Sequence, residues 1–281
     1  MTEDTELDEL MPDVIDLAVR AGHAILEIYN GSGYDIESKD DRSPLTSADI
    51  ASHELIVNGL RELRPSWPIL SEESAEVAFD ERRQWSRYWL VDPLDGTREF
   101  IKRNGEFTVN IALIEDGVPI LGVVYAPVID VRYAGIRGLG AWKCVDAAEP
   151  ESISVCALGD GPVRVAGSRS HSDERLQAYL DRLGEHELRP MGSSLKSCLV
   201  AEGAADLYPR LGPTSEWDTA AAQAVVEAAG GHVTDTDLKP LRYNQKDSLL
   251  NPSFLVFGDD SRDWSAYLED KNDENHKMNT K

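Results

Sequence analysis

Apolar residues recur at helical spacing in two stretches near the N-terminus. Between Pro12 and Leu26 they stand three or four positions apart, and Asn30-Gly31 ends the pattern. Proline favours the first turn of a helix and glycine the position after its end, so we expect a helix that begins at Pro12. A second helix is expected from Ser47 to Leu63. Its buried row should contain Ile50, Ile56 or Val57, Leu60 and Leu63.

From residue 89 onward the pattern changes to short apolar runs that are typical of strands. Residues 89–91 (Trp-Leu-Val) form a buried-strand pattern that stops at an Asp-Pro pair. Two longer apolar runs, 107–113 and 120–125, are separated by Glu-Asp-Gly at 115–117 and therefore predict a hairpin. A third strand is expected at 132–136.

After Ser154 strands and helices alternate. The pattern predicts a strand at 163–166, a helix at 173–183 and a second helix at 220–229, which two glycines end. Residues 150–161 separate this part from the hairpin region without a long linker, so we expect two tightly packed halves with a cleft between them.

The fold class expected is therefore mixed α+β, in layers. The N-terminal half, 1–155, should contain a large and mostly antiparallel sheet, and the C-terminal half, 156–257, should be a smaller α/β unit. Residues 258–281 are polar and charged, and we expect them to be a disordered acidic tail.

The composition excludes several classes of function. The 281 residues carry 28 Lys+Arg against 51 Asp+Glu, a formal net charge of −23, which disfavours a nucleic-acid polymer as partner. Three widely spaced cysteines are typical of a reducing compartment and predict neither a disulfide framework nor a thiolate metal site. The acidic N-terminus and the lack of an eighteen-residue apolar run predict a soluble cytoplasmic protein without a transmembrane segment.

Candidate chemistry begins where the run 89–91 ends. Asp92 closes the strand, Pro93 fixes the backbone, and Asp95 follows just before Gly96. This spacing lets two carboxylates and the carbonyl of Leu94 converge beyond the strand, where a hard cation such as Mg²⁺ finds oxygen ligands. Because Asp-Pro and Asp-Gly are also ordinary turn formers, the motif alone is equally compatible with a plain turn.

Further acidic residues stand at comparable junctions. Glu72 and Glu73 follow another short apolar run, while Asp49 and Asp218 lie near the starts of expected helices. Each has a purely structural alternative: Asp49 could complete a capping box, Asp218 could occupy a first helical turn, and the two glutamates could be solvated charge. Together with the motif at 92–97, however, they are similar to the carboxylate ring of a multi-metal phosphatase.

At this point the chain resembles a known family. Residues 92–97 (Asp-Pro-Leu-Asp-Gly-Thr) and 217–222 (Trp-Asp-Thr-Ala-Ala-Ala) resemble the two signatures of the inositol monophosphatase superfamily. Further segments resemble the bacterial 3′(2′),5′-bisphosphate nucleotidases of the CysQ type, namely 71–73, 88–112, 167–171, 192–196 and 207–210. The likeness extends from the first helix to about Phe257, and it implies a layered αβαβα fold of the sugar-phosphatase type.

The resemblance implies two Mg²⁺ ions. The first would be bound by Glu72, Asp92 and the backbone carbonyl of Leu94, and the second by Asp92, Asp95 and Asp218, with Asp92 bridging the two. A third, weaker Mg²⁺ is implied near Glu72.

The resemblance also implies a mechanism of in-line attack by a metal-activated water. Thr97 would help to deprotonate this water, and Asp49 would orient the Thr97 hydroxyl, so that both residues are expected to be catalytic. The backbone N–H groups of Gly96 and Thr97 would hold the phosphate that is cleaved, and no phosphoenzyme is expected.

The implied substrate is a small bisphosphonucleotide. Hydrolysis of the 3′-phosphate of adenosine 3′,5′-bisphosphate would give AMP and phosphate, with the sulfated derivative PAPS as a further substrate, a role in sulfur metabolism and inhibition by Li⁺. The expected substrate-binding residues are Glu72, Leu94, Asp95, Gly96, Thr97, Ser168, Arg169, His171, Ser193, Ser194, Lys196, Tyr208, Arg210 and Asp218.

Two alternative functions, and the questions of membrane association and oligomeric state, stay open at this stage. A phosphatase for inositol 1-phosphate or another sugar phosphate would use the same metals with a different pocket, and Lys196 and Arg210 would then be simple surface charge. A metal-binding or interaction protein could keep the fold without the chemistry. A peripheral association with the inner face of a membrane is known for some relatives, although no basic patch or lipid anchor is evident here, and no oligomeric state is indicated.

Overall fold

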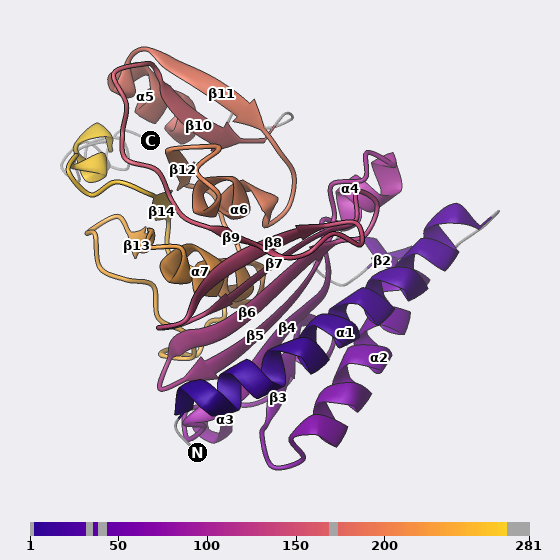
Figure 1. Cartoon of the computed structure of the whole chain (residues 1–281). Helices are drawn as coiled ribbons and strands as arrows, with labels where there is room; N and C mark the ends of the chain where they lie inside the picture. Colours follow the sequence, from indigo (N-terminus) through magenta and orange to yellow (C-terminus); the bar gives the residue numbers. More distant parts are fainter. Residues whose placement is uncertain (1–2, 32–35, 39–43, 169–173, 269–281) are drawn as a thin grey trace, which may run out of the picture.

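The computed structural model describes residues 3–31, 36–38, 44–168 and 174–268, which form helices layered with two large sheets (Figure 1). The strands of the first sheet are β3 (Ile69–Ser71), β4 (Arg87–Asp95), β5 (Thr108–Glu115), β6 (Val118–Ala126), β7 (Val131–Ile136), β8 (Gly140–Val145) and β9 (Glu151–Ile153). They lie in sequence order from β3 to β9, and all neighbours are antiparallel except the pair β3 and β4. The large, mostly antiparallel N-terminal sheet is therefore confirmed.

The second sheet is smaller and mixed. Its strands are β10 (Val163–Gly167), β11 (His186–Pro190), β12 (Leu207–Arg210), β13 (His232–Asp235) and β14 (Phe254–Phe257). Their order is β11-β10-β12-β14-β13, with β10 parallel to both of its neighbours and β14 antiparallel to both of its own. A separate short hairpin joins β1 (Ile36–Ser38) to β2 (Pro44–Thr46).

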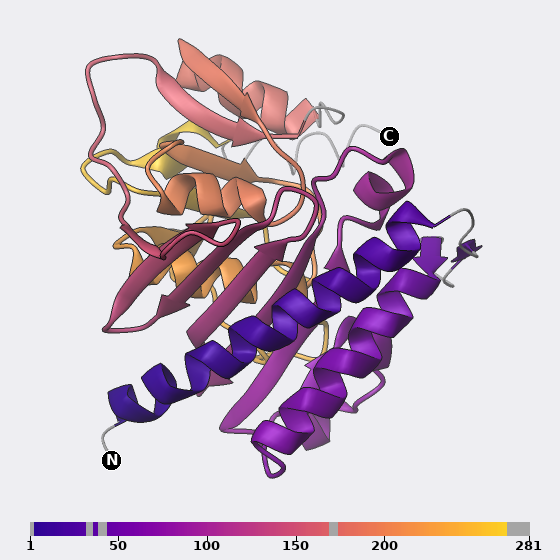
Figure 2. The ribbon, with the colours of Figure 1, turned by 45° about the vertical axis from the view of Figure 1, so that its right-hand side comes forward.

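Helices form the remaining layers. They are α1 (Glu3–Asn30), α2 (Ser47–Leu63), α3 (Phe79–Arg82), α4 (Thr97–Lys102), α5 (Glu174–Leu183), α6 (Leu195–Ala201) and α7 (Ala220–Ala228), with 3-10 turns η1 (Glu72–Ser74), η2 (Glu216–Asp218) and η3 (Trp264–Tyr267). Helices α1 and α2 cover one face of the first sheet, α6 and α7 lie between the sheets, and α5 packs on the far face of the second sheet (Figure 2). This confirms the layered αβαβα fold.

Strand β4 shows why its apolar run is continuous. Trp89 and Val91 pack into the cluster under α1 and α2, whereas Tyr88 and Leu90 pack into the cluster around α6 and α7. A strand covered on both faces needs apolar residues at successive positions. The same double cover buries Asp92, which is only 1% exposed at the end of this run.

Two glycines bring α7 unusually close to the first sheet. A Cβ atom at Gly122 would lie 2.2 Å from the carbonyl oxygen of Ala221, and one at Gly135 would lie 2.6 Å from Cα of Val225. Only hydrogen fits at these two positions, and the alanine-rich surface of α7 matches them. Helix α7, which follows Asp218 of η2, is thereby held against the sheet that contains β4.

Most predicted elements are confirmed. Helix α2 has the predicted bounds, and the predicted hairpin is β5–β6, whose turn residues Asp116 and Gly117 both have positive φ (48° and 76°), as tight hairpins require. The predicted strand at 132–136 is β7. The predicted helix at 220–229 is α7.

Two details of the helix predictions are wrong. Helix α1 begins at Glu3, and Pro12 lies inside it. Burial of Leu7 and Leu10, which are 2% and 1% exposed, stabilises the turns before Pro12 and outweighs the loss of one backbone hydrogen bond. In α2, Ile50 is 43% exposed, because the buried face runs through the polar residues Asp49 and Ser52 instead.

The predicted disorder of the C-terminal tail is wrong for residues 258–268. Trp264 of η3 is fully buried, and its indole N–H donates to the carbonyl of Asp259 at 2.7 Å. The hydroxyl of Tyr179 in α5 donates to the carbonyl of Trp264 at 2.7 Å. A single large aromatic side chain thus anchors this segment to the second sheet, while residues 269–281 lie outside the described ranges.

None of the helices in the described part of the chain is long and apolar enough to cross a bilayer.

Candidate metal centre and active site

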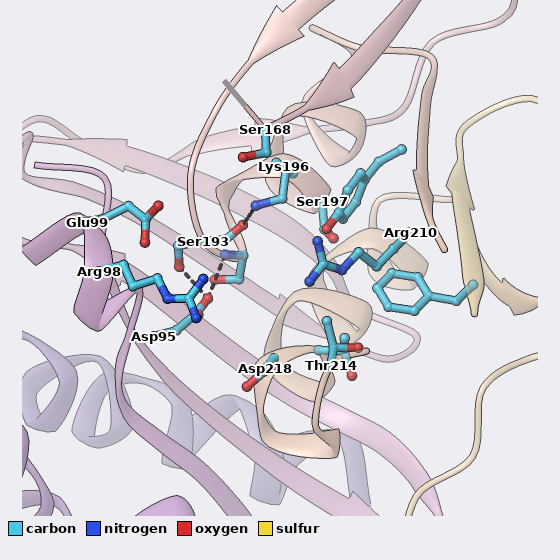
Figure 3. Close-up of a pocket in the computed structure, with 14 residues that line it drawn as sticks. Asp95, Arg98, Glu99, Ser168, Ser193, Lys196, Ser197, Arg210, Thr214 and Asp218 are labelled. Atoms are coloured by element: carbon cyan, nitrogen blue, oxygen red, sulfur yellow. Dashed lines mark hydrogen bonds between the residues drawn. The ribbon is translucent and has the colours of Figure 1, made fainter. Parts of the chain in front are cut away.

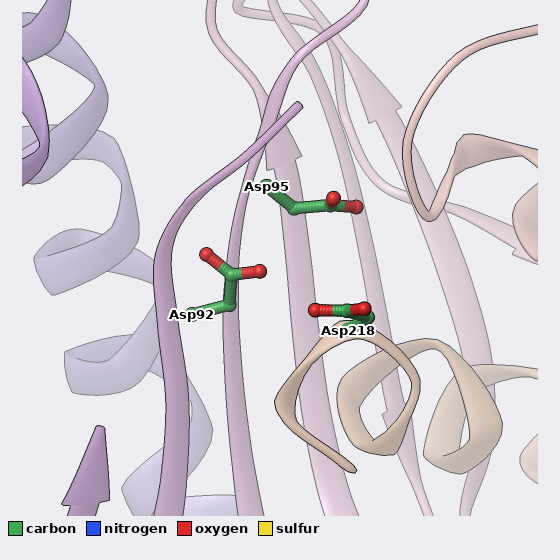
Figure 4. A group of neighbouring side chains, drawn as sticks. All are labelled: Asp92, Asp95 and Asp218. Atoms are coloured by element: carbon green, nitrogen blue, oxygen red, sulfur yellow. The ribbon is translucent and has the colours of Figure 1, made fainter. Parts of the chain in front are cut away.

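Three aspartates converge at one end of the first sheet. Asp92 and Asp95 come from the end of β4, and Asp218 comes from η2, just before α7 (Figure 4). One carboxylate oxygen of each residue lies within 4.8 Å of those of both others. The structure thus joins residues of the two predicted signatures in one cluster.

The cluster is electrostatically unfavourable without a cation. Burial raises the pKa of Asp92 well above its ordinary value, and the charges of Glu72, Asp95, Asp218 and Asp49 raise it further, in that order. Burial and the charge of Asp95 raise the pKa of Asp218 to about 8. A set of crowded carboxylate oxygens of this kind fits a hard divalent cation such as Mg²⁺.

Local hydrogen bonds orient two of the carboxylates. Oδ1 of Asp92 accepts from the backbone N–H of Leu94 at 3.0 Å, within the turn that follows the strand. Oδ2 of Asp218 accepts from the backbone N–H of Ser215 at 2.8 Å, in a capping box around η2. Asp218 therefore lies in the first turn of η2, as its structural alternative predicted, and the same carboxylate also takes part in the cluster.

Helix α2, which packs beside α1, contacts the segments that contain Asp92 and Glu72. Asp49 is fully buried, and one turn further Ser52 Oγ donates to the carbonyl of Pro93 at 2.7 Å. His53 Nδ1 lies 2.9 Å from Oγ of Ser71, the residue before Glu72. Ser52 and His53 were not predicted to belong to the site, although their spacing from Asp49 would have placed them on the same helix face.

Glu72 and Thr97 flank the cluster. Glu72 is half-buried at the start of η1, and its charge is the largest of those that raise the pKa of Asp92. Thr97 begins α4 after Gly96, which has a left-handed φ of 92°, and Thr97 Oγ1 donates to the carbonyl of Leu94 at 3.5 Å. The pairing of Thr97 with Asp49 stays a prediction.

A hydroxyl network links Asp95 to the C-terminal half. Its Oδ2 accepts from the backbone N–H of Ser194 at 2.8 Å and from the hydroxyl of Ser193. Both serine hydroxyls contact Thr108 Oγ1, at 2.6 and 2.9 Å, and Ser194 Oγ donates to Oδ1 of Asn110 at 2.8 Å. Thr108 and Asn110 were missed, and the available signal was two polar residues in an otherwise apolar strand.

Beside the aspartates lies a cavity of about 180 Å³ that both halves line (Figure 3). Its lining includes the predicted residues Asp95, Ser168, Ser193, Ser194, Lys196, Tyr208, Arg210 and Asp218, together with Arg98, Glu99, Ser197, Thr214, Thr219 and Phe254, which were not predicted. Of the other predicted substrate-binding residues, Glu72, Leu94, Gly96 and Thr97 are not part of this lining, and Arg169 and His171 lie outside the described ranges.

The wall opposite the aspartates is cationic. Lys196 is only 8% exposed, its Nζ donates to the carbonyl of Ser193 at 2.6 Å, and it lies 5.5 Å from the ring centre of Tyr208. Burial lowers the pKa of Lys196, while the charge of Asp95 opposes that shift. Arg210 Nη2 donates to the carbonyl of Pro213 at 3.0 Å. The surface-charge alternative is thus wrong for Lys196.

The geometry brings an acidic cluster and a buried cation to one cavity. At the acidic cluster such a site can hold a divalent cation together with one anionic group of a small molecule. At the buried lysine it can hold a second anionic group of that molecule. The arrangement is suited to a substrate with two negatively charged ends.

Comparisons with known proteins agree with this geometry. The model of the inositol monophosphatase family matches residues 6–264. The chain is 55% identical over 248 residues to the 3′(2′),5′-bisphosphate nucleotidase CysQ of Escherichia coli strain K12, a match that covers 88% of this chain and 99% of that protein.

Solved structures of the same kind are also similar. The crystal structure of CysQ from Bacteroides thetaiotaomicron, a bacterial member of the inositol monophosphatase family, superimposes with a TM-score of 0.79 at 43% identity and covers 91% of this chain and 98% of its own. An inositol monophosphatase from Anabaena superimposes with a TM-score of 0.71 at 26% identity, covering 96% and 99%.

Proposed function

The chain belongs to the inositol monophosphatase family, and on that premise we propose that it is a Mg²⁺-dependent phosphatase that hydrolyses the 3′-phosphate of adenosine 3′,5′-bisphosphate to AMP and phosphate. The observation that carries the proposal is the shared cavity, in which the aspartate cluster stands opposite Lys196 and Arg210. The identity to the E. coli nucleotidase supports the same substrate.

The residues proposed to hold two Mg²⁺ ions are Glu72, Asp92, Asp95, Asp218 and the carbonyl of Leu94. When bound, a divalent cation supplies Lewis-acid stabilisation of the charge on a phosphoryl oxygen. The four carboxylates would hold that cation, and they would repel a phosphate in its absence. A third, weaker Mg²⁺ site near Glu72 stays a prediction.

Thr97 and Asp49 are proposed to handle the proton of the attacking water. Thr97 lies at the start of α4, next to the turn that contains Asp92 and Asp95, and fully buried Asp49 lies close enough to raise the pKa of Asp92. A buried carboxylate can orient a threonine hydroxyl and accept its proton while the hydroxyl oxygen takes one from the water. The backbone N–H groups of Gly96 and Thr97 would hold the phosphate that is cleaved.

The opposite wall is proposed to select the nucleotide. Lys196 and Arg210 would hold the 5′-phosphate, and Tyr208 with Phe254, whose rings meet edge to face with centroids 5.9 Å apart, would flank the base. Ser168 lines the same cavity and could contact the ribose. An inositol monophosphate offers this wall no second phosphate, so its binding should gain less from the two cations.

Product analysis tests the proposal. The protein is incubated with adenosine 3′,5′-bisphosphate and Mg²⁺, and the mononucleotide formed is separated from its isomer. We expect 5′-AMP and phosphate, and no reaction in EDTA. Formation of 3′-AMP would show that the phosphates bind in the opposite order, and no release of phosphate would favour the non-catalytic alternative.

Four further properties follow from the same proposal. Hydrolysis of PAPS, inhibition by Li⁺, removal of the bisphosphonucleotide left by sulfate activation and a cytoplasmic location all stay predictions. Peripheral association with the inner membrane stays an open alternative, because no basic patch or lipid anchor is evident in the sequence.

A further inference from the structure

A buried arginine outside the cavity connects the two halves of the protein. Arg82, at the end of α3, is 2% exposed. Its guanidinium donates to Oδ1 of Asn244 at 2.6 Å, to the carbonyl of Lys246 at 3.1 Å and to the carbonyl of Asp247. The amide of Asn244 donates back to the carbonyl of Arg82 at 2.5 Å. One side chain of the N-terminal half therefore holds a loop of the C-terminal half at three points.

That loop, residues 243–251, holds the turn that contains Asp218. The backbone N–H of Asn244 donates to Oε2 of Glu216 at 2.8 Å, and the backbone N–H of Glu216 donates to the carbonyl of Leu249 at 2.8 Å. The side-chain amide of Asn251 donates to the carbonyl of Ser215 at 2.7 Å. The turn 215–218 is thus hydrogen-bonded to the loop along its length.

Asp218 is rigidly attached to this turn. Its Oδ2 accepts from the backbone N–H of Ser215, so a shift of the turn moves the carboxylate with it. Its carboxylate lies within 4.8 Å of a carboxylate oxygen of Asp92 and of Asp95. Like charges at such distances repel, so the turn needs an attachment that keeps Asp218 facing the other two aspartates.

Arg82 also lies close in sequence to another proposed metal ligand. Glu72 and Arg82 share the connection between β3 and β4, which is short and contains η1 and α3. This connection therefore contributes the carboxylate of Glu72 to the cluster. Through Arg82 it also holds the loop that binds the turn of Asp218. The two ends of the cluster are linked by a chain of contacts that passes outside the cavity.

We propose that Arg82 is a positioning residue for Asp218: through Asn244 and Glu216 it holds the aspartate against the end of β4 and so sets the affinity of the site for a divalent cation. The inference rests on the proposed function only in that the aspartate cluster binds such a cation. Residues that orient metal ligands from behind typically contribute tenfold or more to metal affinity.

Two variants separate this role from plain stabilisation. Arg82→Gln removes the charge and most of the contacts. Asn244→Gly keeps the backbone N–H that binds Glu216 and suits the left-handed φ of 57°. It removes the two hydrogen bonds that the Asn244 side chain makes with Arg82 and leaves those from Arg82 to the carbonyls of Lys246 and Asp247. Arg83→Gln is the matched control, because Arg83 is the exposed neighbour, with 59% of its side chain accessible and an ion pair to Asp80 at 3.6 Å.

The experiment measures the dissociation constant of Mg²⁺ from the full chain by calorimetry without nucleotide, and then the Mg²⁺ concentration that gives half-maximal phosphate release. We expect both values to rise about tenfold or more in Arg82→Gln and Asn244→Gly. The KM for the nucleotide at saturating Mg²⁺ should change little, and Arg83→Gln should behave like wild type. If Arg82→Gln does not fold, Asn244→Gly decides the result.

The outcomes for this inference and for the proposed function are distinguishable. Unchanged Mg²⁺ affinity in a folded Asn244→Gly variant would overturn the positioning role, even if the melting temperature falls. A wild type that binds Mg²⁺ but releases no phosphate would contradict the proposed function alone. A wild type that binds no Mg²⁺ would overturn both.

Discussion

The two walls of the cavity are built on opposite electrostatic principles. The aspartate wall gathers like charges in a buried place, where burial and mutual repulsion raise the pKa of Asp92 and of Asp218. On the cationic wall, Lys196 already donates to a backbone carbonyl and lies against an aromatic ring. The carboxylates of the first wall repel one another unless a cation is bound, whereas Lys196 on the second wall is already held in place to bind an anion.

This difference suggests a division of labour. Groups that are strained before binding and relieved by a cation are suited to the reacting phosphate, where charge changes during the reaction. Groups that are already held by contacts to backbone carbonyls, as Lys196 and Arg210 are, are suited to hold the part of the substrate that does not react. Changes on the aspartate wall should therefore affect kcat, and changes on the cationic wall should affect KM.

The largest effect is expected from Asp92→Asn. The substitution keeps the shape of the side chain but removes the charge that faces both proposed Mg²⁺ positions. Turnover should fall on the order of 10³-fold, the upper range for loss of one electrostatic contact in an active site. Steady-state kinetics at saturating Mg²⁺ measures the effect, and circular dichroism checks the fold. Ordinary turnover by a folded variant would refute the central role of Asp92.

Lys196→Ala should act on binding instead. Loss of a charge-assisted contact costs about 1.5–3 kcal/mol, so KM for adenosine 3′,5′-bisphosphate should rise about tenfold to a hundredfold. The change for inositol 1-phosphate should be much smaller. Lys196→Met serves as control, because it keeps most of the apolar stem and should show the same loss. Equal losses on both substrates would refute a role in binding a second phosphate.

The metal-free protein should lose stability as pH rises. Since the pKa of Asp218 is raised in the folded state, from 3.8 to about 8, the folded protein binds more protons than the unfolded chain between these values. The contribution of Asp218 to stability is full below pH 3.8 and is lost as pH rises towards 8. Mg²⁺ should therefore raise the melting temperature more at pH 8 than at pH 5.

Asp218→Asn tests the cause of that pH dependence. The variant should show a flatter melting profile in EDTA and a smaller stabilisation by Mg²⁺. An equal effect of Mg²⁺ at pH 5 and pH 8 in the wild type would contradict the account of a strained carboxylate wall.

The smallest effect is expected from Arg98→Gln. Arg98 lines the same cavity but is exposed, so its charge is screened by solvent. Exposed ion pairs contribute about 0.2–1 kcal/mol, and KM should therefore change by no more than about fivefold. A change as large as that of Lys196→Ala would place the anion site at the rim of the cavity.

The sequence predicted the parts of the molecule that depend on local pattern. Strand β4, the β5–β6 hairpin, α2 and α7 follow from runs of apolar residues and from turn residues such as Asp116-Gly117. The positions of Asp92, Asp95 and Asp218 in one cluster were predicted because the first two follow an expected strand, the third precedes an expected helix, and the resemblance joined them. Glycines of β6 and β7 then make the approach of α7 physically possible.

The remaining features depend on contacts between distant segments. The start of α1 before Pro12 and the anchoring of Trp264 are decided by burial against other layers, which no local pattern records. Thr108 joins the site because strand register and helix position bring it to serines from the other half. Arg82 likewise could not be assigned a role from local pattern, because its partner Asn244 is far away in sequence.

The most direct test of the account compares kcat/KM for adenosine 3′,5′-bisphosphate and inositol 1-phosphate, each with Mg²⁺ and with EDTA. The two-wall account predicts a strong preference for the bisphosphonucleotide and loss of both activities in EDTA. A preference for inositol 1-phosphate would contradict the role of the cationic wall, and activity that survives EDTA would contradict the role of the aspartate wall.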